Sequence, residues 1–175
     1  MSVKSRYWLW VAGWLTLIYA TLYLVPFAVK FLQRHIPFDT VITIFLYSVL
    51  TGLIVGYVLR RGFRKVSSYF LCLLVVFCYA YGVSKVRFPA EKIHFLQYGF
   101  LAYLIYRALR LDVKRPLAYI FSFILTGVFG WIDEGIQNFL PNRYYELVDV
   151  QLNCICAALG LSLVYIFERE RSEQG

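Results

Sequence analysis

The stretch DTVITIFLYSVLTGLIVGYVL, residues 39–59, has one charged residue, at its first position, and is otherwise mainly apolar. A helix needs about 20 mainly apolar residues to cross the hydrocarbon core of a membrane. Residues 39–59 satisfy this requirement, so we expect a transmembrane helix with Asp39 or Thr40 as its N-cap. Gly52 and Gly56 form a GxxxG pattern in it, which indicates close packing within the bundle or, alternatively, a dimer contact. The oligomeric state therefore stays open.

The composition of the whole chain also indicates a membrane protein. Hydrophobic residues make up 61% of its 175 residues, charged residues make up 16%, and the mean hydropathy is +0.63. Typical globular chains are about half apolar and about a quarter charged. A soluble domain of this size could not bury so much apolar surface, whereas a bilayer accepts such a surface as the outer face of the protein.

Further apolar segments lie on both sides of residues 39–59, and together they predict an all-α integral membrane protein with a bundle of about six transmembrane helices. The expected spans are residues 7–29, 39–59, 66–83, 89–109, 116–139 and 147–167. The first span is longer than the core of a signal peptide and no clear cleavage site follows it. The connections are short and nothing repeats, so residues 1–175 form one domain with a polar tail, residues 168–175, that is expected to fray.

Basic residues predict the orientation of this bundle. With six spans, twelve Lys and Arg residues fall on the side of the two termini and six fall on the other side. Cytoplasmic segments carry the excess of Lys and Arg in membrane proteins, so both termini are expected in the cytoplasm. The net charge of +8 thus indicates topology and contact with anionic membrane lipids, and nucleic acid binding is not expected.

Two stretches carry polar residues that a simple apolar bundle does not need. The first, PAEKIHFLQY (residues 89–98), opens the fourth span, and its Glu91, His94 and Tyr98 are spaced to share one face of a helix. The second begins with WIDEGIQNFLPNR (residues 131–143) and continues to Asn153. In it Glu134 shares a face with Gln137, as Asp149 does with Asn153.

The predicted topology brings these stretches together. The start of the fourth span, the end of the fifth and the start of the sixth all fall on the outer side. The ionisable residues expected to converge there are Glu91, Lys92, His94, Asp133, Glu134, Arg143 and Asp149. Ionisable groups in or near a membrane span are costly and generally indicate function.

The order and spacing of these residues resemble the VanZ-like family. The family's acidic-Lys-x-x-His-Phe-x-x-Tyr segment is matched by Glu91, Lys92, His94, Phe95 and Tyr98. Its Asp-Glu-x-x-Gln, Pro-x-Arg and Asp-x-x-x-Asn patterns are matched by Asp133, Glu134, Gln137, Pro141, Arg143, Asp149 and Asn153. The resemblance covers residues 89–160, with departures at Asn142, Glu146 and Cys156, where the family more often has Gly, Ser and Gly.

The resemblance implies a role in the cell envelope rather than a particular reaction. The family is named for a protein associated with resistance to teicoplanin, a glycopeptide antibiotic that acts on cell-wall precursors. We therefore expect an outward-facing site for a lipid-linked or peptidoglycan-type substrate, or for the glycopeptide, and a contribution to glycopeptide resistance.

If the chain is an enzyme, its residues divide into two groups. The acid–base or nucleophilic groups are Glu134, His94, Asp149 and Asp133. The substrate-binding groups are Lys92, Arg143, Gln137, Asn153, Tyr98 and Glu91, with the two cations suited to a phosphate or carboxylate.

Other interpretations use the same residues. Lys92 and Arg143 could instead neutralise Asp133, Glu134 or Asp149 in a structural ion-pair network of a non-catalytic envelope-binding or scaffold protein. No cofactor or metal is expected, although His94, Glu134 and Asp149 could be ligands. A lipid transporter or flippase ranks last, because such proteins usually show inverted repeats and broken helices.

Overall fold

The computed structural model describes residues 2–140 and 145–172, without the side chains of residues 25, 26, 28 and 30, and these ranges contain helices and no strand. A short 3₁₀ helix, η1 (Glu91–Ile93), precedes the fourth of six α-helices. The α-helices are α1 (Val3–His35), α2 (Phe38–Arg61), α3 (Val66–Lys85), α4 (His94–Leu109), α5 (Arg115–Gln137) and α6 (Leu147–Ser172). The predicted all-α bundle is confirmed, and each predicted span corresponds to one of these helices.

Within the part of the chain that the structure describes, five helices, rather than the six expected, are long and apolar enough to cross a membrane. They are Val3–Leu24 of α1 and the whole of α2, α3, α5 and α6. The exception, α4, has 16 residues, or about 24 Å of helix at about 1.5 Å per residue. The hydrocarbon core of a typical bilayer is about 30 Å thick.

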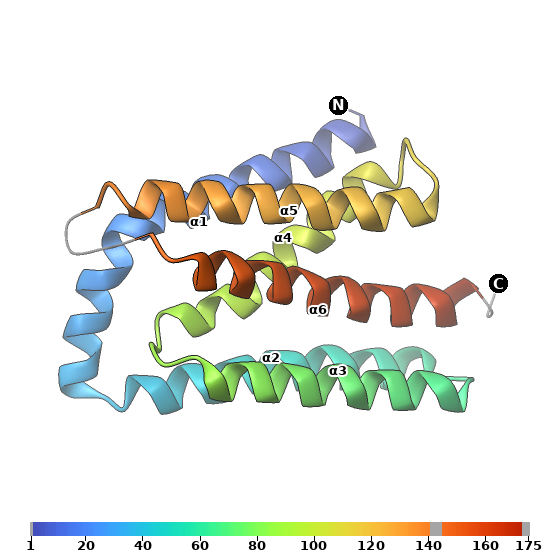
Figure 1. Cartoon of the computed structure of the whole chain (residues 1–175). Coiled ribbons are helices and arrows are strands. Elements are labelled where there is room, and N and C mark those ends of the chain that lie inside the picture. Colours follow the sequence, from blue (N-terminus) through green and yellow to red (C-terminus); the bar gives the residue numbers. More distant parts are fainter. Residues whose placement is uncertain (1, 141–144, 173–175) are drawn as a thin grey trace.

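Helix α4 forms the centre of the bundle instead of an outer face. Ten of its 16 residues are buried, against three of the 24 in α2. It runs obliquely between α1 and α5 on one side and α2 and α3 on the other, and carries the chain from one end of the bundle to the other (Figure 1). The two termini therefore lie at the same end.

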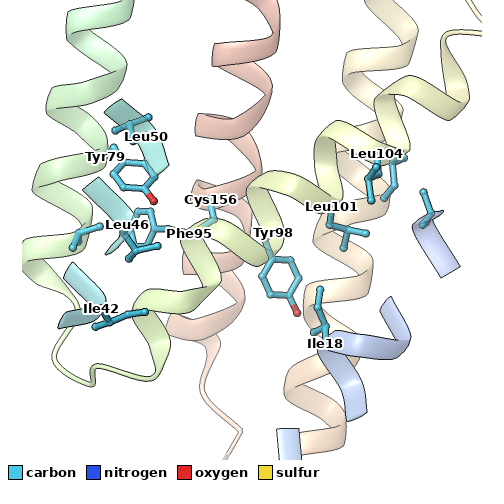
Figure 2. Close-up of a cluster of buried hydrophobic side chains, with 13 residues drawn as sticks. Ile18, Ile42, Leu46, Leu50, Tyr79, Phe95, Tyr98, Leu101, Leu104 and Cys156 are labelled. Carbon is cyan, nitrogen blue, oxygen red and sulfur yellow. The ribbon is translucent and has the colours of Figure 1, made fainter. Parts of the chain in front are cut away.

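The core gathers around both sides of α4 (Figure 2). On one side Phe95 meets the ring of Tyr79 edge-on, with centroids 5.0 Å apart, near Leu46 of α2. On the other side Tyr98 points toward Ile18 of α1 (Figure 2). The outer helices leave large apolar side chains exposed, which suits a lipid-facing surface.

Two glycines set the close crossing of α4 and α6. A Cβ atom on Gly160 would lie 2.6 Å from the carbonyl oxygen of Gly99 and 2.7 Å from its Cα atom. Small residues let helix backbones approach closely in membrane proteins. Gly52 and Gly56 behave differently, because a Cβ atom on either would meet nothing within 4 Å. The expected packing of this GxxxG pattern within the bundle is therefore wrong.

The end of α6 corrects the expectation of a frayed tail. The helix continues to Ser172, and Glu170 is fully buried. Its carboxylate accepts hydrogen bonds from the hydroxyl of Ser68 and, at 2.7 Å, from the backbone N–H of Arg64. The prediction failed for residues 168–172 because Glu170 binds the connection between α2 and α3 and the start of α3, while Glu168 binds Arg115 of α5 and Tyr106 of α4. The rest of the predicted tail, residues 173–175, lies outside the described residues.

Helix α1 bends in its second half, so that its last turns run along one end of the bundle toward α2 (Figure 1). The sequence has a proline at position 26, and a proline has no backbone N–H to donate inside a helix. At the start of α2 the N-cap is Pro37, and no side chain caps the helix. Asp39 therefore lies within the first turn, and the predicted cap at Asp39 or Thr40 is wrong.

Candidate functional site

A hydrogen bond between two fully buried side chains joins α4 to α5. The hydroxyl of Tyr98 donates to Oδ2 of Asp133 over 2.6 Å. The ring of His94, one turn earlier on α4, meets the Tyr98 ring edge-on with centroids 5.5 Å apart. The predicted stripe thus places His94 beside Tyr98, and Tyr98 against a carboxylate of α5.

The second carboxylate of α5 is also buried. Glu134 accepts a 3.1 Å hydrogen bond at Oε1 from the side-chain amide of Gln137, three residues later on the same helix. This pairing confirms the predicted shared face. Both side chains lie inside the bundle, where a hydrogen bond to a carboxylate limits the cost of burying it.

Helix α6 contributes Asn153, which is fully buried against Gly130 of α5. Its side-chain amide points toward the carbonyl oxygen of Gly130 at 3.4 Å, and a Cβ atom on Gly130 would lie 2.8 Å from Cβ of Asn153. Asp149 lies one turn earlier on α6 and is half-buried. The structure thus uses Asn153 to fix the contact between α5 and α6.

Lys92 has a partner that the sequence analysis did not identify. Its ammonium group lies 2.5 Å from Oδ1 of Asp39 and donates to the hydroxyl of Thr43 over 3.1 Å. The lysine is buried, whereas the aspartate side chain is 57% exposed. Lys92 therefore joins η1 to α2, and the expectation that it neutralises Asp133, Glu134 or Asp149 is wrong.

A cavity of about 340 Å³ lies among α1, α2, the start of α4 and the end of α5. Its polar wall contains Glu91, His94, Gln97 and Gln137, and its other walls are mainly apolar side chains of α1 and α2. On the rim, Leu17 is 50% exposed and Phe45 is 48% exposed. The cavity is therefore amphipathic and opens on the outer surface of the bundle between α1 and α2.

The cavity brings together only part of the predicted site. Glu91, His94 and Gln137 line it. Glu134 and the Tyr98–Asp133 pair do not line it but are each linked to a lining residue, through the Gln137 hydrogen bond and the His94 ring contact. Arg143 and Pro141 lie outside the described residues.

This arrangement suits proton transfer and the binding of polar groups. An imidazole is the side chain whose ordinary pKa lies closest to neutrality, and His94 presents it to the cavity beside Glu91 and Gln137. Across residues 2–140 and 145–172, no group of three or more His, Cys, Asp or Glu side chains is placed to hold a metal ion.

Sequence reasoning missed Asp39, Thr43 and Gln97. Asp39 is the one charged residue of an otherwise apolar span, which was a signal of a functional or pairing role. The backbone carbonyl of Gln97 accepts a 3.0 Å hydrogen bond from the indole of Trp14, which holds α1 against the polar end of α4. Trp14 and Gln97 are 83 positions apart, and no pattern in the sequence predicts their contact.

Comparison with known proteins gives one distant relative. The chain is 28% identical over 114 residues to an uncharacterised protein of Schizosaccharomyces pombe, covering 63% of this chain and 69% of that protein. No family profile matches the chain, and no solved structure matches it.

Proposed function

We propose that this chain is a multi-pass membrane protein with both termini in the cytoplasm, and that its outward-facing cavity acts on a lipid-linked component of the cell envelope. The observation that carries the proposal is the amphipathic cavity of about 340 Å³, with Glu91, His94 and Gln137 on its polar wall. Both the charge distribution and the position of the two termini at one end of the bundle (Figure 1) support the orientation.

The shape of the cavity suits an amphiphile. The half-exposed Leu17 and Phe45 give its rim an apolar surface facing the surrounding lipid. A lipid chain can lie along this surface while its polar headgroup reaches His94 and Gln137. Ligand sites are commonly mainly apolar with a few placed polar groups, and this cavity has that composition.

The proposed chemistry is proton transfer by His94 and Glu134. His94 meets the substrate on the cavity wall. Glu134 lies one hydrogen bond behind Gln137, so the Gln137 side chain must turn aside before Glu134 can exchange a proton with the substrate. Two titratable groups in different environments are the usual basis of an acid–base pair. The ring of Tyr98 packs against His94 and positions it, and the buried hydrogen bond to Asp133 holds Tyr98 in place. Resemblance to the VanZ-like family adds the envelope role, and the expectation of a part in glycopeptide resistance rests on that resemblance.

A second function is favoured by the Lys92–Asp39 pair. This pair and the Tyr98–Asp133 hydrogen bond each join different helices, as structural contacts of a non-catalytic binding protein would. Such a protein would hold the lipid-linked component in the cavity without changing it. The enzyme would change the covalent structure of the lipid-linked component, whereas the binding protein would leave it unchanged.

The experiment is a comparison of lipids and lipid-linked envelope precursors in membranes of cells with and without the protein. We expect one lipid-linked species to accumulate, and a covalently related one to decrease, when the protein is absent. A change in the distribution of a species without a covalent change would favour the binding function. Identical profiles, together with unchanged teicoplanin susceptibility, would reject both.

A further inference from the structure

A second groove starts beside the polar cavity, with which it shares Leu96 of α4, and runs toward the opposite end of the bundle. It has a volume of about 500 Å³ and runs among α2, α4 and α6, past Gly99 and Gly160. Three arginines line it, each in the last turns of one of these helices: Arg61, Arg107 and Arg171. These helix ends lie at the end of the bundle that also holds both termini (Figure 1).

The rest of the groove is mainly apolar. Leu50, Leu53, Leu163 and Phe167 are among the residues that line it. Leu53 is 55% exposed, so the groove is open to the surroundings of α2. An apolar surface within helices that can span a membrane faces lipid chains, whereas the arginines lie where lipid headgroups are found.

The polar end of the groove has an excess of positive charge. Glu168 is the one carboxylate among the lining residues that the structure describes. It already lies 3.1 Å from the guanidinium of Arg115 and accepts a hydrogen bond from the hydroxyl of Tyr106. The described residues that line the groove thus include three arginines and one carboxylate, a net positive charge that favours an anionic ligand.

Arg107 is held at this end by two tyrosines. Its guanidinium donates to the hydroxyl of Tyr7 over 2.6 Å and to that of Tyr103 over 3.3 Å, and lies 5.1 Å from the centre of the Tyr7 ring. These contacts are with neutral groups, so they fix the arginine without neutralising its charge. A guanidinium held in place is well suited to bind a phosphate through paired N–H donors.

We propose that this groove binds a phospholipid of the surrounding membrane that has an anionic headgroup. An acyl chain lies along Leu50, Leu53 and Leu163, and the headgroup phosphate lies against Arg61, Arg107 and Arg171. The lipid fills a gap between α2 and the α4–α6 crossing. The groove shares only Leu96 with the polar cavity, and its arginines line the groove alone, so the proposal holds whether or not that cavity is catalytic.

The test measures phospholipid selectivity of the purified full chain in nanodiscs made from equal amounts of phosphatidylglycerol and phosphatidylcholine. After extraction into mild detergent, native mass spectrometry counts the lipids that stay bound. The site variant is Arg61→Gln with Arg171→Gln. The control is Arg6→Gln with Arg60→Gln, which removes the same charge from exposed positions that do not line the groove. Circular dichroism checks that both variants stay helical.

We expect the wild-type chain and the control to retain phosphatidylglycerol in preference to phosphatidylcholine. Each basic residue near a membrane surface contributes about 1 kcal/mol of attraction to anionic lipid, so the site variant should lose roughly tenfold or more of this preference. Equal loss in both variants, or no loss in either, would overturn the proposal.

A groove-filling variant tests the apolar part separately. Leu163→Trp narrows the groove without changing any charge, and we expect it to release the bound lipid. If phosphatidylglycerol is still retained in this variant, or if millimolar inorganic phosphate displaces it from the wild type, the arginines bind anions without a lipid in the groove, and the proposal is wrong.

Discussion

The hydroxyl of Tyr98 donates a 2.6 Å hydrogen bond to the carboxylate of Asp133, and neither side chain has any exposed surface. This contact joins the buried central helix, α4, to α5 at the polar end of the bundle. A carboxyl group without hydrogen bonds would be costly to bury there. The tyrosine therefore supports both the packing of α4 and the placement of His94.

Replacing this tyrosine by phenylalanine tests its contribution to stability. Tyr98→Phe keeps the ring and removes one donor to the buried carboxylate, so we expect a loss of about 1–3 kcal/mol in the free energy of unfolding. Reversible unfolding in detergent micelles measures it. Tyr23→Phe, at an exposed position of α1, is the control and should change little. Equal stability of the two variants would show that the Tyr98 hydroxyl contributes nothing.

The crossing of α4 and α6 gives a second prediction. Gly160→Ala adds a Cβ atom 2.6 Å from the backbone of Gly99, so the helices must separate, at a cost of about 1–3 kcal/mol. Gly52→Ala is the matched control, because nothing lies within 4 Å of its added Cβ atom. Alanine has a higher helix propensity than glycine, so this variant should be as stable as the wild type or slightly more stable. The prediction fails if thermal unfolding ranks the two variants in the opposite order.

The Lys92–Asp39 pair is tested by a double-mutant cycle. Asp39→Asn alone leaves a buried ammonium group with two neutral partners, the new amide oxygen and the hydroxyl of Thr43, and should destabilise the protein. Lys92→Met alone supplies the other single variant of the cycle. Lys92→Met with Asp39→Asn removes both charges and should recover part of the loss. Because the aspartate is more than half exposed, we expect a coupling energy of about 1 kcal/mol. Strictly additive effects would mean that the pair contributes no interaction.

Orientation is tested by cysteine labelling of intact cells. In a chain whose four native cysteines are replaced by alanine, Arg87→Cys lies in the connection before η1, and Lys114→Cys lies in the connection before α5. Both positions are exposed. The 12-to-6 distribution of Lys and Arg predicts that a membrane-impermeant thiol reagent labels Arg87→Cys alone. Labelling of Lys114→Cys alone would reverse the orientation and place the polar cavity in the cytoplasm.

Hydropathy predicted where the helices lie because runs of about 20 apolar residues suit a bilayer and little else. It could not separate a helix that faces lipid from one buried by other helices, since both are apolar. It therefore predicted α4 as an ordinary lipid-facing span, although α4 crosses the bundle at its buried centre. The buried Glu170 was missed for a related reason. A charged residue in a polar terminal segment is expected to be exposed to solvent. The partners that bury Glu170, Ser68 and Arg64, are more than 100 positions away in the sequence.

The candidate site was predictable where its contacts are local. Glu134 and Gln137 are three residues apart on one helix, and their hydrogen bond follows from helical geometry. Lys92 and Asp39 are 53 residues apart, and no periodic pattern relates them. The contact depends on how α2 packs against η1, which a single sequence does not specify.

The most direct test of the proposed function is the isosteric variant Glu134→Gln. Gln137 can still donate to the amide oxygen at position 134, so the bundle should fold, while the proposed acid–base group is lost. Glu146→Gln, an exposed carboxyl group before α6, is the matched control. With both variants expressed at the wild-type level, the measurement is the rate of conversion of the lipid-linked envelope component that depends on this protein. We expect Glu134→Gln to lower that rate by about 10²–10⁴-fold and Glu146→Gln to leave it unchanged. A well-expressed Glu134→Gln variant with wild-type conversion would contradict the account and make Glu134 a structural carboxylate.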